Sequence, residues 1–288
     1  MATLQNKIDF VLFFTVENAN PNGDPLNGNM PRSDYDGYGE VSDVCIKRKI
    51  RNRLQDEGEP IFVQSNDRIE DDFKSLEARF NNQFKGTGKD KDSDEAVYDK
   101  SCQMWIDVRS FGQVITFQSR SIGIRGPVSI SLGKSLSPID IISMQITRST
   151  NGKEMKSGKA PDTMGAKHFV NFGVYKVKGS INTYFSEKTG FTDEDAAKIK
   201  EALRTLFVND ASSARPEGSM EVKTLYWFSH PNKLGVASSA KIHNLVDSKL
   251  KEDVIKPLSY EDYIIGLNED ELSIYEDKGL KVDVIEGI

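Results

Sequence analysis

Hydrophobic and polar positions along the chain follow strand-like and helix-like patterns in turn. The aromatic and β-branched run at residues 8–16 has the length and composition of a buried strand. Residues 18–39 then predict a long irregular loop, because glycine and proline recur there beside asparagine or aspartate. Loops of this length inside a compact domain are usually functional or disordered.

The next segment predicts an amphipathic helix from Ser42 to about residue 55. Ser42 is a favourable N-cap, and Ile46, Ile50 and Leu54 fall on one stripe of such a helix. Residues 44–55 hold five cations and no acid; the cations are Lys47, Arg48, Lys49, Arg51 and Arg53. On a helical wheel, Lys47 and Arg51 flank the apolar stripe on one side, with Arg48 beyond them. The pattern therefore predicts a cationic ridge that can contact phosphate groups.

The remaining patterns predict an α+β fold, with helices on one face of an antiparallel sheet. The whole chain, residues 1–288, is expected to form one domain. Helices are predicted within the acidic segment 60–100 and at 192–208 and 236–250; strands are predicted at 113–118, 128–132, 141–147, 221–228 and 281–285. Residues 169–185 predict either one long strand or a hairpin broken at Gly179.

Charge is distributed unevenly along the chain. The net charge is −6, which by itself disfavours a nucleic-acid-binding protein. Residues 100–180, however, carry 12 basic and 4 acidic side chains, and the segments before and after them are acidic. Local sign decides where a polyanion docks, so a nucleic-acid partner remains open, as does an ordinary solvated face.

Other classes of protein fit the composition less well. No uncharged apolar stretch reaches the roughly 18 residues that a membrane helix needs, and the apolar run near residue 10 contains Asp9 and precedes no signal cleavage site. The two cysteines, Cys45 and Cys102, are too few for a disulfide framework, which favours a cytoplasmic location. No metal site, cofactor or catalytic residue is expected.

Several motifs resemble one family. The segment NANPNGDPLNGNMPRSDYDGYGEVSDVCIKRKIRNRL (residues 18–54) closely resembles the RAMP-type backbone subunit of type I CRISPR Cascade complexes, in particular the Csd/Csh branch of type I-C systems. Further similar motifs are DVRSFG (107–112), ITR (146–148) and TMGAKHFVNFGVY (163–175). The resemblance extends from about residue 7 to about residue 250.

This resemblance implies a modified RNA-recognition-type, ferredoxin-like fold with insertions and a protruding β-hairpin thumb. Residues 57–100 would be an acidic helical insertion, and residues 148–167 the basic thumb. Subunits of this family assemble as a helical filament along the guide RNA. By position, the candidate RNA-binding residues are Arg32, Ser42, Lys47, Arg48, Arg51, Arg125, Arg148, Lys167 and His168. Met155 or Met164 is the candidate wedge that displaces a base.

The implied partners are the CRISPR guide RNA, the target DNA strand, other copies of the chain, and the guide-end-capping, large and small Cascade subunits. No membrane partner is expected. Lysine and arginine contacts to phosphate are indifferent to base sequence, as a protein that coats any guide requires. Sequence reading is then left to base pairing with the target.

Two other functions remain open from the sequence. Asp24 lies in the loop, and related type III backbone subunits use a loop aspartate to cleave RNA, which suggests a metal-dependent ribonuclease. However, aspartate beside glycine and proline is ordinary turn chemistry, and no second acid stands at metal-ligand spacing. Alternatively, the basic helix docks an acidic protein surface, and the chain is a purely protein-binding scaffold.

Overall fold

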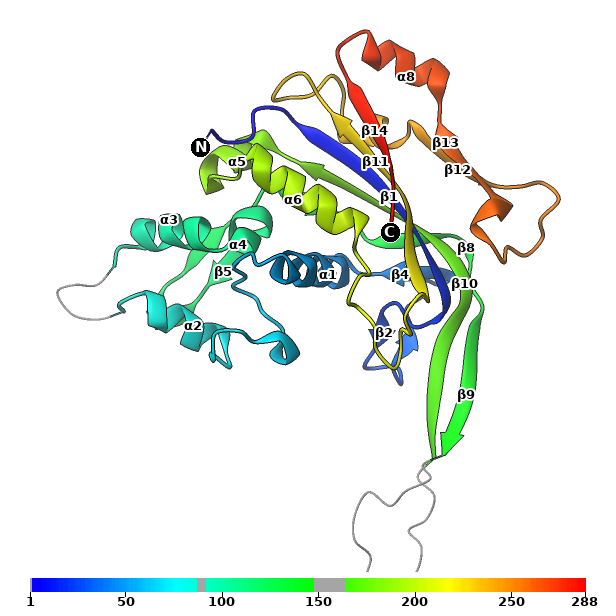
Figure 1. Ribbon diagram of the computed structural model, residues 1–288, viewed down its shortest axis with the longest axis horizontal. Coiled ribbons are helices and arrows are strands. Elements are labelled where there is room, and N and C mark those ends of the chain that lie inside the picture. Colours follow the sequence, from blue (N-terminus) through cyan, green and yellow to red (C-terminus); the bar gives the residue numbers. More distant parts are fainter. Residues whose placement is uncertain (1, 87–91, 148–163) are drawn as a thin grey trace, which may run out of the picture.

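A large antiparallel sheet runs through the protein in the computed structural model, which describes residues 2–86, 92–147 and 164–288 (Figure 1). Its strand order is β14-β11-β1-β10-β8-β4, and β7 and β9 also pair with β10. The strands of this sheet are β1 (Ile8–Ala19), β4 (Tyr38–Val41), β7 (Val128–Ile130), β8 (Gly133–Pro138), β9 (Ile141–Thr147), β10 (Met164–Ile181), β11 (Met220–Ser229) and β14 (Lys281–Glu286).

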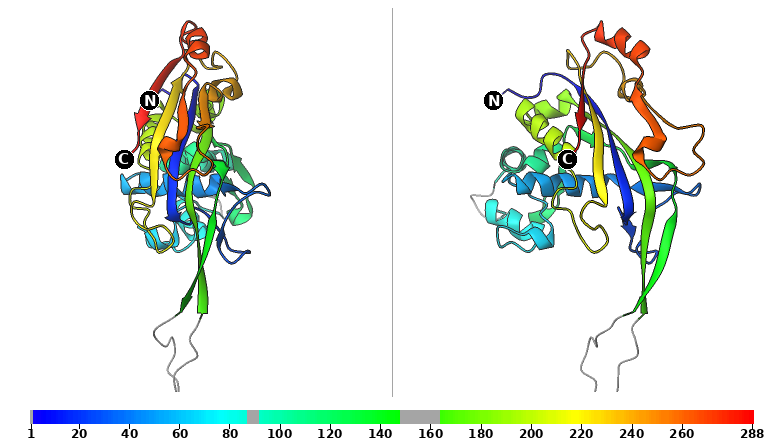
Figure 2. Two further views of the ribbon diagram at one scale, coloured as in Figure 1. Left: turned by 90° about the vertical axis from the view of Figure 1, so that its right-hand side faces the viewer. Right: turned by 45° about the vertical axis from the view of Figure 1, so that its right-hand side comes forward.

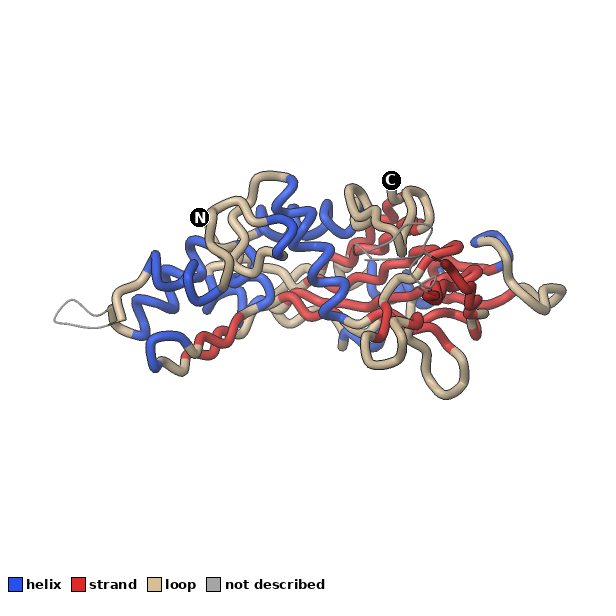
Figure 3. Tube along the Cα trace, turned by 90° about the horizontal axis from the view of Figure 1, so that it is seen from below, coloured by secondary structure: helices blue, strands red, loops and turns tan. Residues whose placement is uncertain are grey.

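Helices and short ladders surround this sheet, and Figure 3 shows the helices gathered toward one end and the strands toward the other. The helices are α1 (Asp43–Asp56), α2 (Leu76–Gln83), α3 (Asp94–Met104), α4 (Ile106–Phe111), α5 (Thr183–Thr189), α6 (Asp193–Arg204), α7 (Ser239–His243) and α8 (Glu269–Glu276). The two-stranded ladders are β2 (Gly23–Asp24) with β3 (Met30–Pro31), β5 (Gln113–Ile115) with β6 (Ile122–Ile124), and β12 (Val246–Leu250) with β13 (Tyr263–Leu267). Single 3₁₀ turns lie at Asn66–Arg68, Phe117–Ser119 and Tyr260–Asp262.

Strand β1 lies at the centre of the sheet and is buried on both faces. It pairs with β10 on one side and β11 on the other, which satisfies its backbone groups. Phe10 and Phe14 pack into the core on one face, and Val11 and Phe13 into a second core on the other face. The predicted buried strand is therefore confirmed.

Helices α1 and α6 cover the first of these faces. The predicted stripe of Ile46, Ile50 and Leu54 is buried there, together with residues of α6. Helix α6 begins with a capping box between Thr192 and Asp195, as its sequence suggests. The other face is not bare, because α7 and the β12–β13 ladder pack against it. The expectation of helices on one face only is wrong in this respect.

One further prediction fails because distant contacts override local pattern. Residues 236–250 predicted a helix, but only the short α7 forms, and 246–250 become β12 by pairing with β13. Of the two alternatives for residues 169–185, the single long strand is confirmed as far as residue 181, because Gly179 does not break β10. A Cβ atom there would lie 2.0 Å from Cζ of Phe10, so glycine at this position admits the aromatic ring against a continuous strand.

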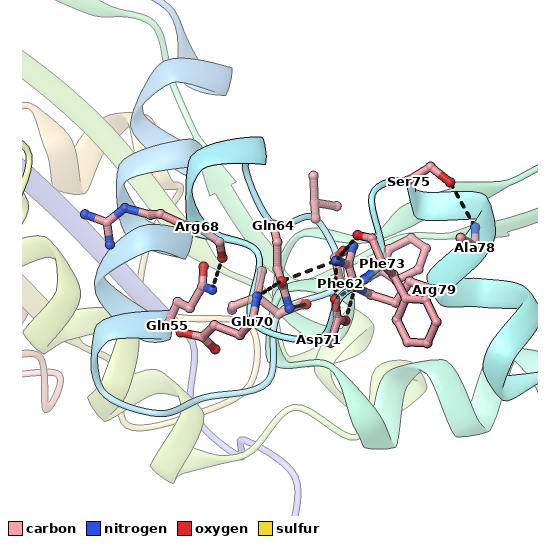
Figure 4. Close-up of polar contacts among 12 residues, drawn as sticks. Gln55, Phe62, Gln64, Arg68, Glu70, Asp71, Phe73, Ser75, Ala78 and Arg79 are labelled. Atoms are coloured by element: carbon pink, nitrogen blue, oxygen red, sulfur yellow. Dashed lines mark hydrogen bonds and ion pairs between the residues drawn. The ribbon is translucent and has the colours of Figure 1, made fainter.

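The segment expected to be a helical insertion belongs to a lobe with its own hydrophobic core, formed by buried residues between Phe62 and Ile124. We call this lobe the insertion lobe. Helices α2 and α3 form as expected for residues 57–100, and their core extends to β5 and β6. Residues 60–74 are largely irregular instead of helical, and the buried Arg79 holds them (Figure 4). Its guanidinium donates to the Phe62 carbonyl at 2.8 Å, to the Phe73 carbonyl at 3.1 Å and to the carboxylate of Asp71. These bonds replace the backbone pairing that a helix would supply.

Strand β9 and the first part of β10 form an antiparallel pair that projects from the body (Figure 2). Its register runs from Ile141 opposite Val170 to Thr147 opposite Met164. The strand predicted at 141–147 is confirmed. Arg148 and Met155 lie outside the described residues, as does the rest of the segment 148–163.

A buried polar cluster fastens the start of β1 to the segment that follows β11. Asp9 is fully buried, and its carboxylate accepts hydrogen bonds from His230 Nε2 at 2.8 Å and Lys7 Nζ at 2.9 Å. His230 Nδ1 accepts from the backbone amide of Val236, so Nε2 carries the proton that it donates to Asp9. Burial raises the pKa of Asp9, but the hydrogen bonds from His230, Ser239 and Lys7 outweigh it and leave that pKa below its ordinary value.

Candidate nucleic-acid interface

The start of α1 is fixed by the loop that precedes it. Ser42 caps the helix, with its hydroxyl accepting from the Cys45 amide at 3.3 Å. The side-chain oxygen of Asn22 accepts from the Ser42 amide at 2.9 Å, and the Asn22 carbonyl accepts from the Arg32 amide at 3.2 Å. Asn22 therefore brings Arg32 and Ser42, which are ten positions apart, to one place beside the helix terminus.

Lys47 lies one turn further along α1. Its ammonium pairs with Asp43 at 2.9 Å, and both side chains keep contact with solvent. An exposed pair of this spacing contributes only about 0.3–0.5 kcal/mol, so the ammonium is easily transferred to another anion. Arg32 also forms a weak, exposed ion pair: its Nη2 lies 3.4 Å from Asp24 Oδ1, and its side chain is 39 % exposed.

Arg51 does not form part of an open cationic ridge, and this corrects the expectation from the helical wheel. Its Nε donates to Asp107 Oδ2 at 2.9 Å, and the side chain is 12 % exposed. Asp107 is fully buried and also accepts from the backbone amides of Phe62 and Val63. Arg51 thus neutralises a carboxylate that joins α1 to the insertion lobe.

The other cations of α1 also have partners within the chain. Arg48 donates to the Val63 carbonyl at 2.6 Å, and desolvation and the nearby Arg51 charge lower its pKa. Lys49 is buried in an ion pair with Asp210, and Arg53 pairs with two acids at the C-terminal end of its own helix. Of the five cations on this helix, Lys47 is therefore the one held most weakly by partners within the chain.

Arg125 is exposed and directly follows β6, and its guanidinium covers the ring of Phe185 at 5.2 Å from the centroid. The neighbouring Gly126 allows a close backbone approach, since a Cβ there would lie 2.3 Å from the Ser110 carbonyl oxygen. The geometry thus gives Arg125 a packing role within the chain while its side chain stays in contact with solvent.

The candidate residues of the hairpin are only partly described. Lys167 and His168 lie on β10 opposite Met144 and Ser143, and His168 Nδ1 lies 2.8 Å from the Ser143 hydroxyl. Met164 is the first residue of β10. Figure 1 shows the hairpin of β9 and β10, on which Lys167 and His168 lie, projecting away from α1. The described candidate residues therefore lie in three places: at the loop and α1, after β6 at Arg125, and on the hairpin.

Asp24 has the contacts of a turn residue. Its side chain accepts from the Leu26 amide at 3.2 Å and pairs with Arg32. Among the described residues, no group of three or more histidine, cysteine, aspartate or glutamate side chains is placed to hold a metal ion.

Three further lysines lie together although they are not neighbours in the sequence: Lys134 on β8, and Lys176 and Lys178 on β10. They line a cavity together on the sheet face that carries β12 and β13. The spacing of Lys176 and Lys178 at i and i+2 on a strand was the available signal, because it places both on one face. Lys134 needed the strand register, which sequence alone does not supply.

None of the helices in the described part of the chain is both long and apolar enough to cross a membrane. Both cysteines are free thiols: Cys102 is buried, and desolvation raises its pKa to about 12, whereas Cys45 is half-buried, and desolvation raises its pKa as well.

Comparisons with known proteins show which proteins this chain is similar to. The curated CRISPR-associated protein Cas7 of Haloferax volcanii is 26 % identical over 229 residues, which cover 69 % of this chain and 63 % of that protein. One chain of a solved structure described as a "CRISPR RNA-guided surveillance complex, pre-nicking" has a similar fold, with a TM-score of 0.50, 13 % identity, and coverage of 94 % of this chain and 88 % of that chain. A chain of another CRISPR RNA-guided surveillance complex gives a TM-score of 0.45, 15 % identity, and coverage of 94 % and 83 %.

The family model described as "CRISPR-associated protein Cas7" matches residues 6–268, which include α1, the hairpin strands β9 and β10, and every strand of the large sheet except β14. A match of this extent spans nearly every element described above. The chain therefore belongs to the Cas7 family of CRISPR-associated proteins.

Proposed function

We propose that this chain is a non-catalytic subunit that binds CRISPR guide RNA and polymerises along it to form the helical backbone of a type I-C Cascade surveillance complex. In that assembly it supports pairing of the guide with the target DNA strand in antiviral defence. Its partners are further copies of itself and the guide-end-capping, large and small subunits. Membership of the Cas7 family and the likeness to a chain of an RNA-guided complex support this proposal.

The observation that carries it is the placement of Ser42 at the N-terminus of α1 and Lys47 on its first turns, with the backbone of Arg32 held beside Ser42 through Asn22. The ion pairs of Arg32 and Lys47 with acidic side chains of the same chain are exposed and weak. Ser42 lies at the positive end of the helix dipole. Two exchangeable cations beside a helix N-terminus suit the phosphates of a single strand. Such contacts carry no base specificity, which a guide-coating protein requires.

The hairpin of β9 and β10 is assigned the role of the thumb that reaches over the RNA. Lys167 and His168 would contact the RNA from the described part of this hairpin. Arg148 would also contact the RNA, and Met155 or Met164 would be the wedge that displaces a base. The α+β body is proposed to be a modified ferredoxin-like, RNA-recognition-type fold. Arg48, Arg51 and Arg125 are not needed for this proposal, because their guanidinium groups have partners within the chain.

The direct test compares two lysines that each pair with an acid four residues earlier on a helix. The Lys47–Asp43 and Lys198–Glu194 distances are 2.9 and 2.8 Å, and Lys198 also pairs with Glu59 at 2.8 Å. We expect Lys47→Gln to weaken binding to a labelled single-stranded RNA, and Lys198→Gln to leave it unchanged. The log–log salt slope of the Lys47→Gln variant should be smaller by about 0.7 for each phosphate that the variant no longer neutralises.

Equal affinities for the two variants and the unmodified protein would contradict the proposed interface. The ribonuclease alternative is tested in the same preparation. Assembled protein incubated with guide, paired target and Mg²⁺ should leave both strands intact, and cuts that disappear in Asp24→Ala would contradict a non-catalytic role.

A further inference from the structure

A cavity of about 410 Å³ lies on the sheet face opposite α1, between β8, β10 and β4. Its volume falls within the roughly 300–1,000 Å³ of small-ligand pockets. Three lysines line it, Lys134, Lys176 and Lys178, and no carboxylate belongs to its described lining. We call this feature the lysine pocket.

The strand register places like charges directly against one another in the lysine pocket. Lys134 on β8 is the cross-strand partner of Lys176 on β10, and Lys178 follows on the same face of β10. Like charges directly opposite each other destabilise a sheet. Desolvation first, and then the Lys178 charge, lower the pKa of Lys176 to about 8. The pocket therefore favours an anion that would relieve this repulsion.

Acidic groups around the pocket neutralise it only in part. Asp34 pairs with Lys134 at 2.6 Å, and Glu40 also acts on Lys134 through its charge. On the β12 side, Asp247 acts on Lys176 through its charge. Among the described residues, neither Lys176 nor Lys178 has a carboxylate within ion-pair distance.

The donors available to a ligand in this cavity are ammonium N–H groups beyond those already in use, since Lys134 pairs with Asp34 and Lys176 donates to the Val246 carbonyl at 2.8 Å and the Ser248 hydroxyl at 3.3 Å. The hydroxyls of Ser131 and Ser135 already donate to the carbonyls of Leu132 and Ser137. Ammonium groups donate and never accept, so the matching ligand is negative and rich in acceptors. Tyr38 adds an aromatic ring to the wall, with the Lys134 ammonium over the ring at 5.0 Å from its centroid. An aromatic ring is a surface on which a base can stack.

We propose that the lysine pocket binds a phosphate group of a polynucleotide, on the sheet face opposite α1. This assignment rests on the proposed function and adds a second phosphate contact, supplied by different strands. A phosphate fits better than a lone carboxylate for two reasons. Every nucleotide of a strand carries a charged phosphate, and each phosphate brings a sugar and a base close to the aromatic ring of Tyr38.

The test measures dissociation constants of the full chain for labelled single-stranded RNA and for single-stranded DNA of the same sequence. The variant is Lys176→Gln with Lys178→Gln. Its control is Lys74→Gln with Lys278→Gln, two exposed lysines outside the pocket that give the same change in net charge. We expect roughly a tenfold loss of affinity in the pocket variant only, with a salt slope smaller by about 0.7 for each phosphate that the variant no longer neutralises.

Two further variants separate a defect in binding from a defect in folding. Lys176→Arg with Lys178→Arg keeps both charges and should retain most of the affinity. Lys178→Gln alone spares the bond from Lys176 to the Val246 carbonyl and should still weaken binding. A larger loss for RNA than for DNA would assign the phosphate to an RNA strand, and the reverse would assign it to DNA.

Three results would overturn the assignment. If the unmodified protein binds RNA and the pocket variant binds it equally well, the inference fails and the proposed function stands. If the unmodified protein binds no RNA, both fail. If the pocket variant loses self-association without nucleic acid but keeps its RNA affinity, the occupant is a carboxylate of a second copy and the inference fails.

Discussion

The ion pair between Arg51 and Asp107 provides a sharp test of which cations on α1 are structural. Asp107 is fully buried and accepts three hydrogen bonds, from Arg51 Nε at 2.9 Å and from the amides of Phe62 and Val63 at 2.8 and 3.1 Å. Arg51→Met removes the positive charge but keeps an apolar stem against Phe111, whose ring centroid lies 5.0 Å from the guanidinium carbon. The expected cost is therefore that of an uncompensated buried carboxylate, about 3–5 kcal/mol.

Urea unfolding followed by circular dichroism measures this cost. With an m-value near the upper end for small proteins, about 3 kcal/mol/M, the midpoint of Arg51→Met should fall by more than about 1 M. Asp107→Asn in the same chain removes the unpaired charge and should recover part of the loss. The reasoning is refuted if Arg51→Met unfolds at the unmodified midpoint and weakens RNA binding as strongly as Lys47→Gln does.

Three smaller changes test the local architecture. Ser42→Ala removes the cap bond to the Cys45 amide and should cost about 1 kcal/mol in urea unfolding. Gly179→Ala places a methyl group against the ring of Phe10, and this overpacking should cost at least about 1–3 kcal/mol, measured the same way. Asp9→Asn should lower the thermal midpoint of unfolding at neutral pH. The difference in thermal midpoint between this variant and the unmodified protein should shrink as the pH falls below 3.8. The sign follows because the folded-state pKa of Asp9 is lowered, so its contribution is present above 3.8 and lost as the pH falls through the folded-state value.

Each of these predictions has a clear contrary result. An unchanged midpoint for Ser42→Ala would mean that the loop fixes the helix start without the hydroxyl. Normal stability of Gly179→Ala would mean that the ring of Phe10 moves freely. A constant difference between Asp9→Asn and the unmodified protein down to pH 3 would mean that Asp9 is not the group that titrates.

Local pattern was a good guide wherever neighbours in sequence decide the structure. The cap at Ser42, the stripe of Ile46, Ile50 and Leu54, and the start of α6 depend on residues within one or two turns. The strands β1 and β9 were also predictable, because their composition and length suit a sheet. The expectation of an antiparallel sheet with packed helices followed from the order of these elements.

Pairings between distant residues explain what the sequence could not supply. Arg51 meets Asp107, 56 positions away, and Lys49 meets Asp210, 161 positions away, so a helical wheel could not show that these cations turn inward. Residues 246–250 become a strand only because 263–267 lie beside them. The lysine pocket likewise depends on the register of β8 against β10.

The length of β10 has a mechanical consequence. This one strand of 18 residues begins in the projecting hairpin and ends in the central core, where it pairs with β1 over most of its length. Because β10 continues from the projecting hairpin into the sheet without a loop, the described part of the hairpin is joined rigidly to the core at its base. The direction in which this pair of strands projects is thereby set by the folded core, and the proposed assembly would inherit that direction from each copy of the chain.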